Sequence, residues 1–154
     1  MPKYIDIMGE LTDREEDYLK GILEIIKTKG YARIKDIAIK VKVTPASAVG
    51  MMKKLSKKKY VNYQKYEGVT LTESGMMHAE VISLRHEIFK KFLRIICVPD
   101  QVAEKDAHIL EHQLDPKTII QFNKFVEFIT SAKERPQIIP RMMEMFKKFS
   151  DESG

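Results

Sequence analysis

The sequence predicts a mainly α-helical protein, with an N-terminal winged helix-turn-helix followed by an all-helical second domain. Apolar residues keep a helical period over most of the chain. Two short amphipathic helices meet at a tight turn before Pro45, which is the pattern of a helix-turn-helix. A hairpin signal at Glu67-Gly68 follows the second of these helices directly and therefore predicts a wing.

The first expected helix begins at Asp13 and ends at Gly30. Thr12 and Glu15 match a capping box, in which each side chain accepts a hydrogen bond from the other residue's backbone N–H. Glycine commonly follows the last turn of a helix because it adopts the left-handed conformation without strain. Acidic residues in the first turn agree with the helix dipole, so most of them need no functional explanation.

The helix-turn-helix follows at once. Apolar residues repeat at i, i+3, i+4 and i+7 from Ile34 to Val41, which predicts a short amphipathic helix. Thr44 is a suitable N-cap and Pro45 suits the first helical position, so a second helix starts there. The expected buried stripe of this second helix comprises Ala48, Met51, Met52 and Leu55. Its outward positions are Ala46, Ser47, Val49, Gly50, Lys53 and Lys54.

The wing is expected as two strands, residues 61–65 and 69–72. A long helix then runs from residue 73 towards residue 96, because apolar residues keep a helical rhythm throughout. His78 and His86 both lie on this helix, and we expect His78 to be a surface or partly packed residue.

Further helices are expected from Asp100 to about Leu114 and again after Asp115-Pro116. Pro136 and Pro140 are expected to break the chain, since proline lacks the backbone donor that a helix interior needs. A final amphipathic segment follows, which we expect to pack on the body of the protein or on a partner subunit.

The composition is that of a folded chain large enough for one domain of usual size or two small ones. No apolar run approaches the roughly 18 residues of a membrane span, and no signal-peptide pattern opens the sequence. The single cysteine, Cys97, excludes an internal disulfide and is expected to be a packed thiol. We therefore expect a cytoplasmic protein without a membrane partner.

Positive charge is concentrated in one part of the chain. Residues 31–66 hold ten basic side chains and one acid, Asp36, and so carry a net charge of +9. The whole chain carries +5, so the remainder carries −4. A basic helix-turn-helix next to an acidic remainder indicates a surface that faces double-stranded DNA. The alternative is a lysine-rich surface with no such role.

One short stretch carries the chemistry of a metal site. On a helix, His108, Glu111 and His112 stand at i, i+3 and i+4 and therefore share a face. Two imidazoles and a carboxylate form an incomplete coordination sphere that needs ligands from elsewhere in the chain. The alternative is a polar helix face with two incidental histidines.

The same stretch matches the inverted zinc-protease signature H-x-x-E-H, in which the glutamate acts as general base. A protease of this kind needs a third ligand well downstream and a large substrate chamber. Only 42 residues follow His112, and a DNA-reading module precedes it. We therefore expect no enzymatic activity and no small organic substrate.

Several segments together resemble the diphtheria toxin repressor family of metal-dependent repressors, most closely its short manganese-transport-regulator branch. The similarity extends from about Asp17 to Phe128. It is carried by Gly30-Tyr31-Ala32-Arg33, Val43-Thr44-Pro45-Ala46-Ser47, Arg85-His86-Glu87, Phe92-Leu93-Arg94-Ile95-Ile96 and Glu111-His112. The resemblance implies a DNA-binding domain over residues 1–75 and a helical metal-binding and dimerisation domain over residues 76–154. No third, SH3-like domain is expected.

In this family, a residue of the first helix, a histidine of the long helix and a cluster on the next helix hold one metal ion. Carried over by position, these ligands are Asp17, His86, His108, Glu111 and His112. Two positions depart from the pattern, because Lys20 replaces a carboxylate that helps to hold a second metal, and His108 replaces a carboxylate or cysteine. We therefore expect one divalent transition metal per subunit, Fe²⁺ or Mn²⁺ foremost. The imidazole-rich set also suits Co²⁺, Ni²⁺ or Zn²⁺.

The resemblance implies a homodimeric repressor on a palindromic operator, with recognition helices one helical turn of DNA or a small multiple apart. We expect Ser47 and Lys54 to contact bases, and Thr44, Lys53 and Lys65 to contact phosphates. Ala46 and Gly50 leave room for close approach. Phe122 and Phe125 are expected either in the dimer interface or in the monomer core, between which the sequence does not decide.

A rival interpretation is a marR-like winged-helix regulator, in which the effector is organic or absent and the histidine cluster is incidental. Dependence of DNA binding on a divalent metal separates the two classes of regulator.

Overall fold

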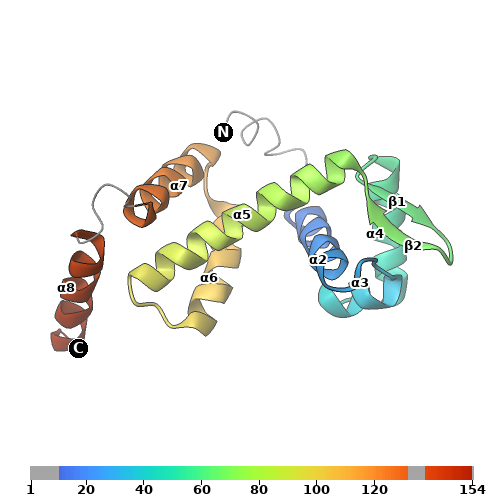
Figure 1. Ribbon diagram of the computed structural model, residues 1–154. Coiled ribbons are helices and arrows are strands. Elements are labelled where there is room, and N and C mark those ends of the chain that lie inside the picture. Colours follow the sequence, from blue (N-terminus) through green and yellow to red (C-terminus); the bar gives the residue numbers. More distant parts are fainter. Residues whose placement is uncertain (1–10, 132–137, 154) are drawn as a thin grey trace. The chain divides into compact units, whose positions relative to one another are not determined.

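The computed structural model describes residues 11–131 and 138–153 of the chain (Figure 1). By compactness the chain divides into two units, Met1–Ser83 and Leu84–Gly154. Helices dominate both, and the strands described form one two-stranded sheet in the first unit. The predicted fold class, a winged helix-turn-helix followed by an all-helical domain, is confirmed. The expected domain boundary at residues 75/76 stays a prediction.

The first unit begins with α2 (Asp13–Lys29), and both ends of this helix follow from local signals. Thr12 and Glu15 form the expected capping box, with Glu15 N donating to Thr12 Oγ1 and Thr12 N donating to Glu15 Oε2. Gly30 ends the helix in the left-handed conformation, at φ 82°, and donates to Ile26 O. Few other residues adopt this conformation without strain.

The helix-turn-helix consists of α3 (Ile34–Lys40) and α4 (Pro45–Lys57). The turn between them passes through Lys42 at φ 56°. It ends at Thr44, whose hydroxyl accepts a hydrogen bond from Ser47 N and so caps α4. The predicted start of α4 at Pro45 is thus confirmed.

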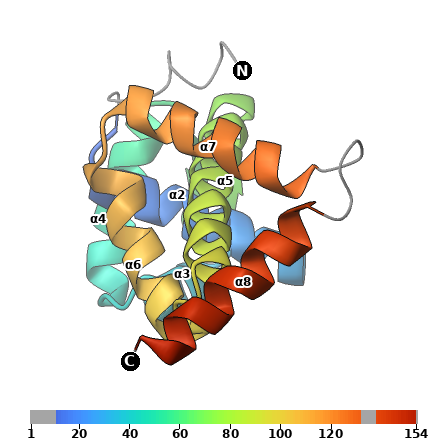
Figure 2. The same cartoon turned by 90° about the vertical axis from the view of Figure 1, so that its left-hand side faces the viewer.

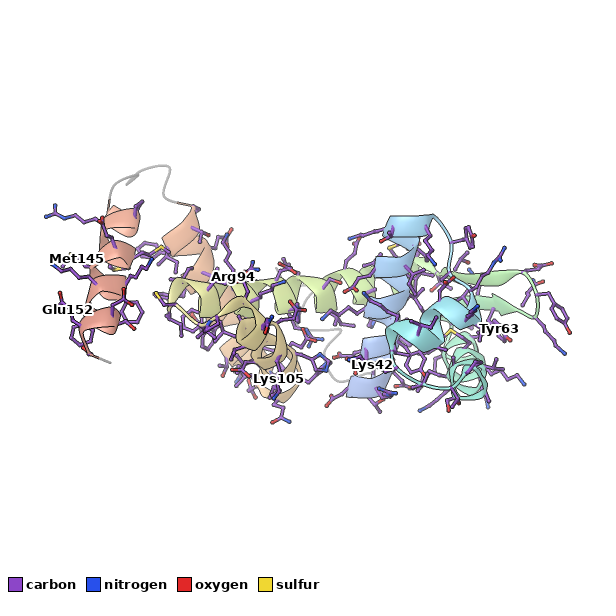
Figure 3. The ribbon with its side chains drawn as sticks, turned by 90° about the horizontal axis from the view of Figure 1, so that it is seen from below. Lys42, Tyr63, Arg94, Lys105, Met145 and Glu152 are labelled. Atoms are coloured by element: carbon purple, nitrogen blue, oxygen red, sulfur yellow. The ribbon has the colours of Figure 1, made fainter. Side chains whose placement is uncertain are left out.

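The wing is an antiparallel pair of strands, β1 (Val61–Gln64) and β2 (Gly68–Leu71). β1 ends one residue earlier than expected, and β2 has the expected length but lies one residue earlier in the chain. Tyr63 lies on this hairpin (Figure 3). Gly68 stands at φ 97°, and a Cβ there would lie 3.0 Å from the carbonyl oxygen of Ala32. Val69 N donates a hydrogen bond to the same oxygen. Ala32, in the segment after α2, thus pairs with β2 through a single antiparallel β-bridge.

The core of the first unit lies where α2, α3, α4 and the wing meet. α2 packs on α3 and β2, and α4 packs on α3 and β1. Burying side chains of this size stabilises the unit by roughly 1.5–3 kcal/mol each. The largest buried apolar side chains of these helices and strands are Tyr18, Leu19, Ile22, Leu23, Ile37, Met52, Leu55 and Val61.

Helix α5 (Glu73–Ile95) starts in the first unit and continues into the second. Its start is packed closely against Tyr60, because a Cβ at Gly75 would lie 1.9 Å from the Tyr60 carbonyl oxygen. His78 is more buried than expected: its ring stacks edge-on against Tyr60 at 4.8 Å, and its Nδ1 lies 2.8 Å from Ser74 O. These contacts make the first turns of α5 part of the first unit.

In the second unit, α6 (Asp100–Gln113) and α7 (Pro116–Thr130) accompany the rest of α5 (Figure 2). Arg94 Nε donates to Asp100 Oδ1 at 2.7 Å across the connection between α5 and α6 (Figure 3). Cys97 lies in this connection at φ 66° and is exposed, so the expectation of a packed thiol is wrong. The chain leaves α5 here, and the thiol has no helix face to pack on.

Aromatic side chains join α7 to α5. The ring of Phe122 lies 5.4 Å from Phe89 and 5.0 Å from Phe92, between centroids. Phe125 lies 6.4 Å from Phe92 and remains 49% exposed. Phe122 thus contributes to the packing of its own subunit, whereas the role of Phe125 at a dimer interface stays a prediction.

The last helix, α8 (Ile138–Glu152), carries exposed Met145, Phe146 and Phe149 (Figure 3). Pro140 lies in its first turn, where the missing N–H would have no helical partner, so the expectation that Pro140 breaks the chain is wrong. Pro136 lies outside the described residues. No helix in the described parts of the chain is long and apolar enough to cross a membrane.

Candidate metal centre

Helix α6 places a row of polar side chains on one face. His108, Glu111 and His112 follow the expected spacing, and Glu104 precedes them by one turn. Glu104 is not among the predicted site residues, although the spacing 104, 108, 111 matches i, i+4 and i+7 on one helix face. That spacing is the signal that could have found it.

Glu111 is the centre of this cluster. Its side chain is 1% exposed, and its Oε2 lies 2.9 Å from Nδ1 of His86 on α5. Its Oε1 lies 3.1 Å from Nδ1 of His108 and 3.3 Å from Nε2 of His112. Burial of a carboxylate is unfavourable unless partners compensate the charge. Three imidazoles surround the Glu111 carboxylate, and imidazoles are also common ligands of divalent transition metals.

The spacing of the donor atoms fits one ion. One ligand atom each of His108, Glu111 and His112 lie within 4.8 Å of one another. Atoms about 2.1 Å from a common ion lie at most about 4.2 Å apart, so small side-chain movements bring these donors into range. The rings of His108 and His112 meet edge to face, with centroids 5.1 Å apart.

His86 is held from both ring nitrogens. Its Nε2 lies 2.9 Å from Glu104 Oε1, opposite the Nδ1 that faces Glu111. The other oxygen of Glu104 accepts a hydrogen bond from Lys90 Nζ at 2.6 Å. Lys90 holds the pKa of Glu104 below its usual range, against a smaller opposing effect of burial, and Glu104 in turn raises the pKa of Lys90. Glu104 is therefore an anion positioned against one edge of the His86 ring.

The structure thus brings together four of the five predicted ligands, His86, His108, Glu111 and His112, within the second unit. Asp17 lies on α2 of the first unit, where it is half-buried, with Lys20 one turn further along the same helix.

The predicted DNA-contacting residues are exposed on the first unit. Thr44 Oγ1 donates to Ser47 Oγ at 2.9 Å, which orients the Ser47 hydroxyl at the first turn of α4. A Cβ on Gly50 would meet no atom within 4 Å, so internal packing does not require glycine there. The exposed set comprises Thr44, Ala46, Ser47, Gly50, Lys53, Lys54 and Lys65.

Glu15, predicted from the sequence only as a capping residue, is fully buried. Its Oε2 accepts a hydrogen bond from Lys58 Nζ at 2.9 Å. Its Oε1 forms ion pairs with Lys58 Nζ at 2.8 Å and with Lys54 Nζ at 3.0 Å. Lys54 lies on α4, and Lys58 follows its last residue. Burial by itself would raise the pKa of Glu15. Hydrogen bonds from Lys58, Thr12 N and Lys54 outweigh burial and lower the pKa to about 2.

Two family models match the chain and together cover most of it. Residues 10–69 match the iron dependent repressor N-terminal DNA binding domain. Residues 72–140 match the iron dependent repressor metal binding and dimerisation domain.

The chain is also similar to named regulators over nearly its whole length. It is 34% identical to the HTH-type transcriptional regulator MntR of Bacillus pumilus, over 92% of this chain and 99% of that protein. It is 38% identical to the protein of the same name from Bacillus subtilis, over 80% of this chain and 87% of that one.

Solved structures with the same fold include the manganese regulator SloR, at 28% identity and a TM-score of 0.64. The metal-dependent transcriptional regulator MtsR follows at 26% identity and a TM-score of 0.68. Each match covers 74% of this chain and 54% of the other. IdeR of T. acidophilum is 27% identical with a TM-score of 0.63, over 71% of this chain and 52% of that one.

Proposed function

Because the chain belongs to the iron-dependent repressor family of metal-dependent transcriptional regulators, we propose that it represses transcription as a homodimer whose operator binding requires a divalent metal. Its family members are regulators of transcription and not enzymes. We further propose a cytoplasmic location and a role in metal-ion homeostasis. The observation that carries the proposal is the buried Glu111 carboxylate surrounded by His86, His108 and His112.

We propose Asp17 as the remaining ligand, so that residues of both units hold one ion. An ion shared in this way would be bound by side chains of three helices, α2, α5 and α6. Asp17 belongs to the DNA-binding unit, and the other ligands belong to the unit that matches a dimerisation domain. If the ion binds more tightly to the arrangement of the protein that fits a palindromic operator, bound metal would raise the fraction of the protein in that arrangement.

Glu104 supports the histidine in this proposal. When its carboxylate accepts the Nε2–H of His86, the Nδ1 lone pair is left facing Glu111. Carboxylates that orient a metal-binding histidine in this way fix its tautomer and raise its basicity. Lys90 keeps Glu104 in place and compensates its charge.

We propose one metal per subunit, Fe²⁺ or Mn²⁺ foremost. The name of the similar manganese regulator SloR supports manganese. The ligand chemistry also accommodates Co²⁺, Ni²⁺ or Zn²⁺, because three imidazoles and two carboxylates are a borderline donor set. Lys20 stands where a second metal would need a carboxylate, and its ammonium group cannot ligate while protonated.

The test is operator binding with and without chelator. An operator is first selected from random duplexes in the presence of Mn²⁺, and its affinity is then measured with added Mn²⁺, Fe²⁺, Co²⁺ or Zn²⁺. We expect the preferred metal to tighten binding by about 5- to 150-fold, the usual range of allosteric coupling. DNA affinity that is indifferent to chelation would overturn the proposal and favour a marR-like regulator.

Two variants separate the metal site from the DNA surface. His112→Ala should abolish metal activation and leave the weak, metal-free DNA binding unchanged. Ser47→Ala should weaken operator binding while Co²⁺ titration still reports one site per subunit. A stoichiometry of two ions among the proposed ligands would contradict the single-metal form of the proposal.

A further inference from the structure

The buried Glu15 carboxylate has no place in the metal site or at the DNA surface. We propose that Glu15 withholds the charges of Lys54 and Lys58 from DNA phosphates and fixes the orientation of α4. In this role it is a positioning residue that keeps non-specific DNA binding weak. The inference rests on DNA binding by the first unit and does not depend on the metal site.

The geometry is that of a built ion cluster. Glu15 is 0% exposed, and its two oxygens share three close contacts with ammonium groups, at 2.8, 2.9 and 3.0 Å. Lys58 contacts both oxygens, and Lys54 contacts one. The partners lie 39 and 43 positions further along the chain, so this cluster joins the first turn of α2 to the last turns of α4.

The lysines in this cluster belong to the side of α4 on which base contacts are predicted. Ser47 and Lys54 are seven residues apart, two helical turns, and therefore lie on one face. Lys58 follows Lys54 after one more turn. Half of the Lys54 side chain and about a third of the Lys58 side chain are exposed, at 54% and 38%. Both could reach phosphate if nothing held them.

Glu15 competes with phosphate for these two cations. Non-specific DNA binding depends almost wholly on cations that displace counterions from phosphates. With Glu15 between them, the two lysines present a net charge of +1 in place of +2. The same contacts hold α4 to α2, and specific contacts by the Ser47 face need a fixed orientation that phosphate contacts do not need.

The first experiment compares Glu15→Gln with the wild type on a mixed-sequence duplex and on the selected operator over a range of salt concentrations. Each freed lysine that reaches phosphate steepens the slope of log K against log salt by about 0.9. We therefore expect a slope steeper by about 0.9–1.8, tighter non-specific binding, and a lower ratio of operator to non-specific affinity. An unchanged slope would overturn the proposal.

The matched control is Glu24→Gln. Glu24 lies on the same helix and pairs with Lys40 of α3, so the variant removes the same charge without freeing a lysine of α4. We expect less than half of the slope change of Glu15→Gln. Equal changes in the two variants would show a general charge effect and would also overturn the proposal.

A second variant does not depend on how Glu15→Gln folds. Lys54→Gln leaves Glu15 with both contacts to Lys58. If Glu15 already withholds Lys54 from phosphate, the slope should change by less than about half of the 0.9 that one phosphate contact contributes. A slope flatter by about 0.9 would show that Lys54 binds phosphate in the wild type, and would overturn the proposal. Far-UV circular dichroism establishes folding in each case.

Discussion

At the scale of single residues, two buried carboxylates each lie at the centre of a cluster of polar side chains. Glu111 contacts three imidazoles in the second unit, and Glu15 contacts two ammonium groups in the first. Each carboxylate lies within hydrogen-bonding or ion-pairing distance of named side chains, which offsets part of the cost of burial. The two clusters differ in chemistry, because a neutral imidazole can bind a transition metal whereas a protonated ammonium group cannot.

The variants Glu111→Gln and Glu104→Gln should have different effects, because Glu111 is proposed as a metal ligand and Glu104 only as the residue that orients His86. Glu111→Gln removes the central donor, so we expect no Co²⁺ binding and loss of the d–d spectrum. Glu104→Gln acts only through His86, and metal affinity should fall by about 10- to 100-fold with the ligand-field bands retained. Asp106→Asn on the same helix is the control. Equal effects of the Glu104 and Asp106 variants would contradict a role for Glu104.

The Glu15 cluster should make stability depend on acid. The pKa of Glu15 is about 2 in the folded protein and ordinary, 4.5, in the unfolded chain. The stabilisation is therefore complete above pH 4.5 and is lost as pH falls towards 2. The shift corresponds to about 3 kcal/mol, which screening of the exposed lysines reduces to about 1–2 kcal/mol.

The measurement is urea unfolding of the metal-free full chain at pH 5 and pH 3, in the wild type and in Glu15→Gln. The wild type should lose about 1 kcal/mol more than the variant between these pH values. Parallel losses would show that Glu15 contributes nothing to the acid sensitivity.

At the scale of elements, the helix starts and ends follow from local chemistry, and two glycines have opposite reasons to be present. Gly75 stands where a side chain has no room, because Tyr60 O occupies the position of its Cβ. Gly50 lies on the exposed face of α4 with open space around it. The first is required by packing inside the unit, and the second agrees with the close approach to DNA that we propose.

Alanine at these two positions should therefore have opposite effects on stability. Gly75→Ala should destabilise the chain by about 2 kcal/mol or more, since the clash involves backbone atoms. Gly50→Ala should stabilise it by about 0.5–1 kcal/mol, the usual difference between these residues within a helix. Chemical denaturation measures both. A weaker operator affinity of Gly50→Ala despite its greater stability would support its place in the DNA surface, and an unchanged affinity would exclude it.

At the scale of the whole molecule, aromatic side chains on α7 of the second unit are exposed. Phe125 and Phe128 on α7 are 49% and 64% exposed, and the family model for this region includes dimerisation. Exposed aromatic residues in a contiguous patch commonly mark protein interfaces. Phe122, in contrast, packs within its own subunit.

Phe125→Glu should therefore shift the protein from dimer to monomer without unfolding it. Sedimentation velocity measures the mass, and Lys124→Glu, which places the same side chain one residue away, is the control. A dimeric Phe125→Glu would remove Phe125 from the interface. Because the operator is proposed to be palindromic, the monomer should also lose operator affinity in the presence of metal.

Local pattern in the sequence was sufficient for the fold. Caps, prolines and turn glycines act within a few residues, so Thr12, Thr44-Pro45 and Gly30 located their helix ends without tertiary information. Helical spacing likewise brought His108, Glu111 and His112 onto one face, and the family resemblance added His86. Asp17 as a ligand stays a prediction.

Only the tertiary structure decided which distant side chains meet. Glu15 reaches Lys54 and Lys58, and Glu104 reaches His86, through the packing of helices and not through spacing along one of them. The burial of His78 against Tyr60 and the exposure of Cys97 were misjudged for the same reason. A periodic pattern states which face of a helix is apolar. Which residue lies opposite a given side chain depends on helix packing, which no local pattern encodes.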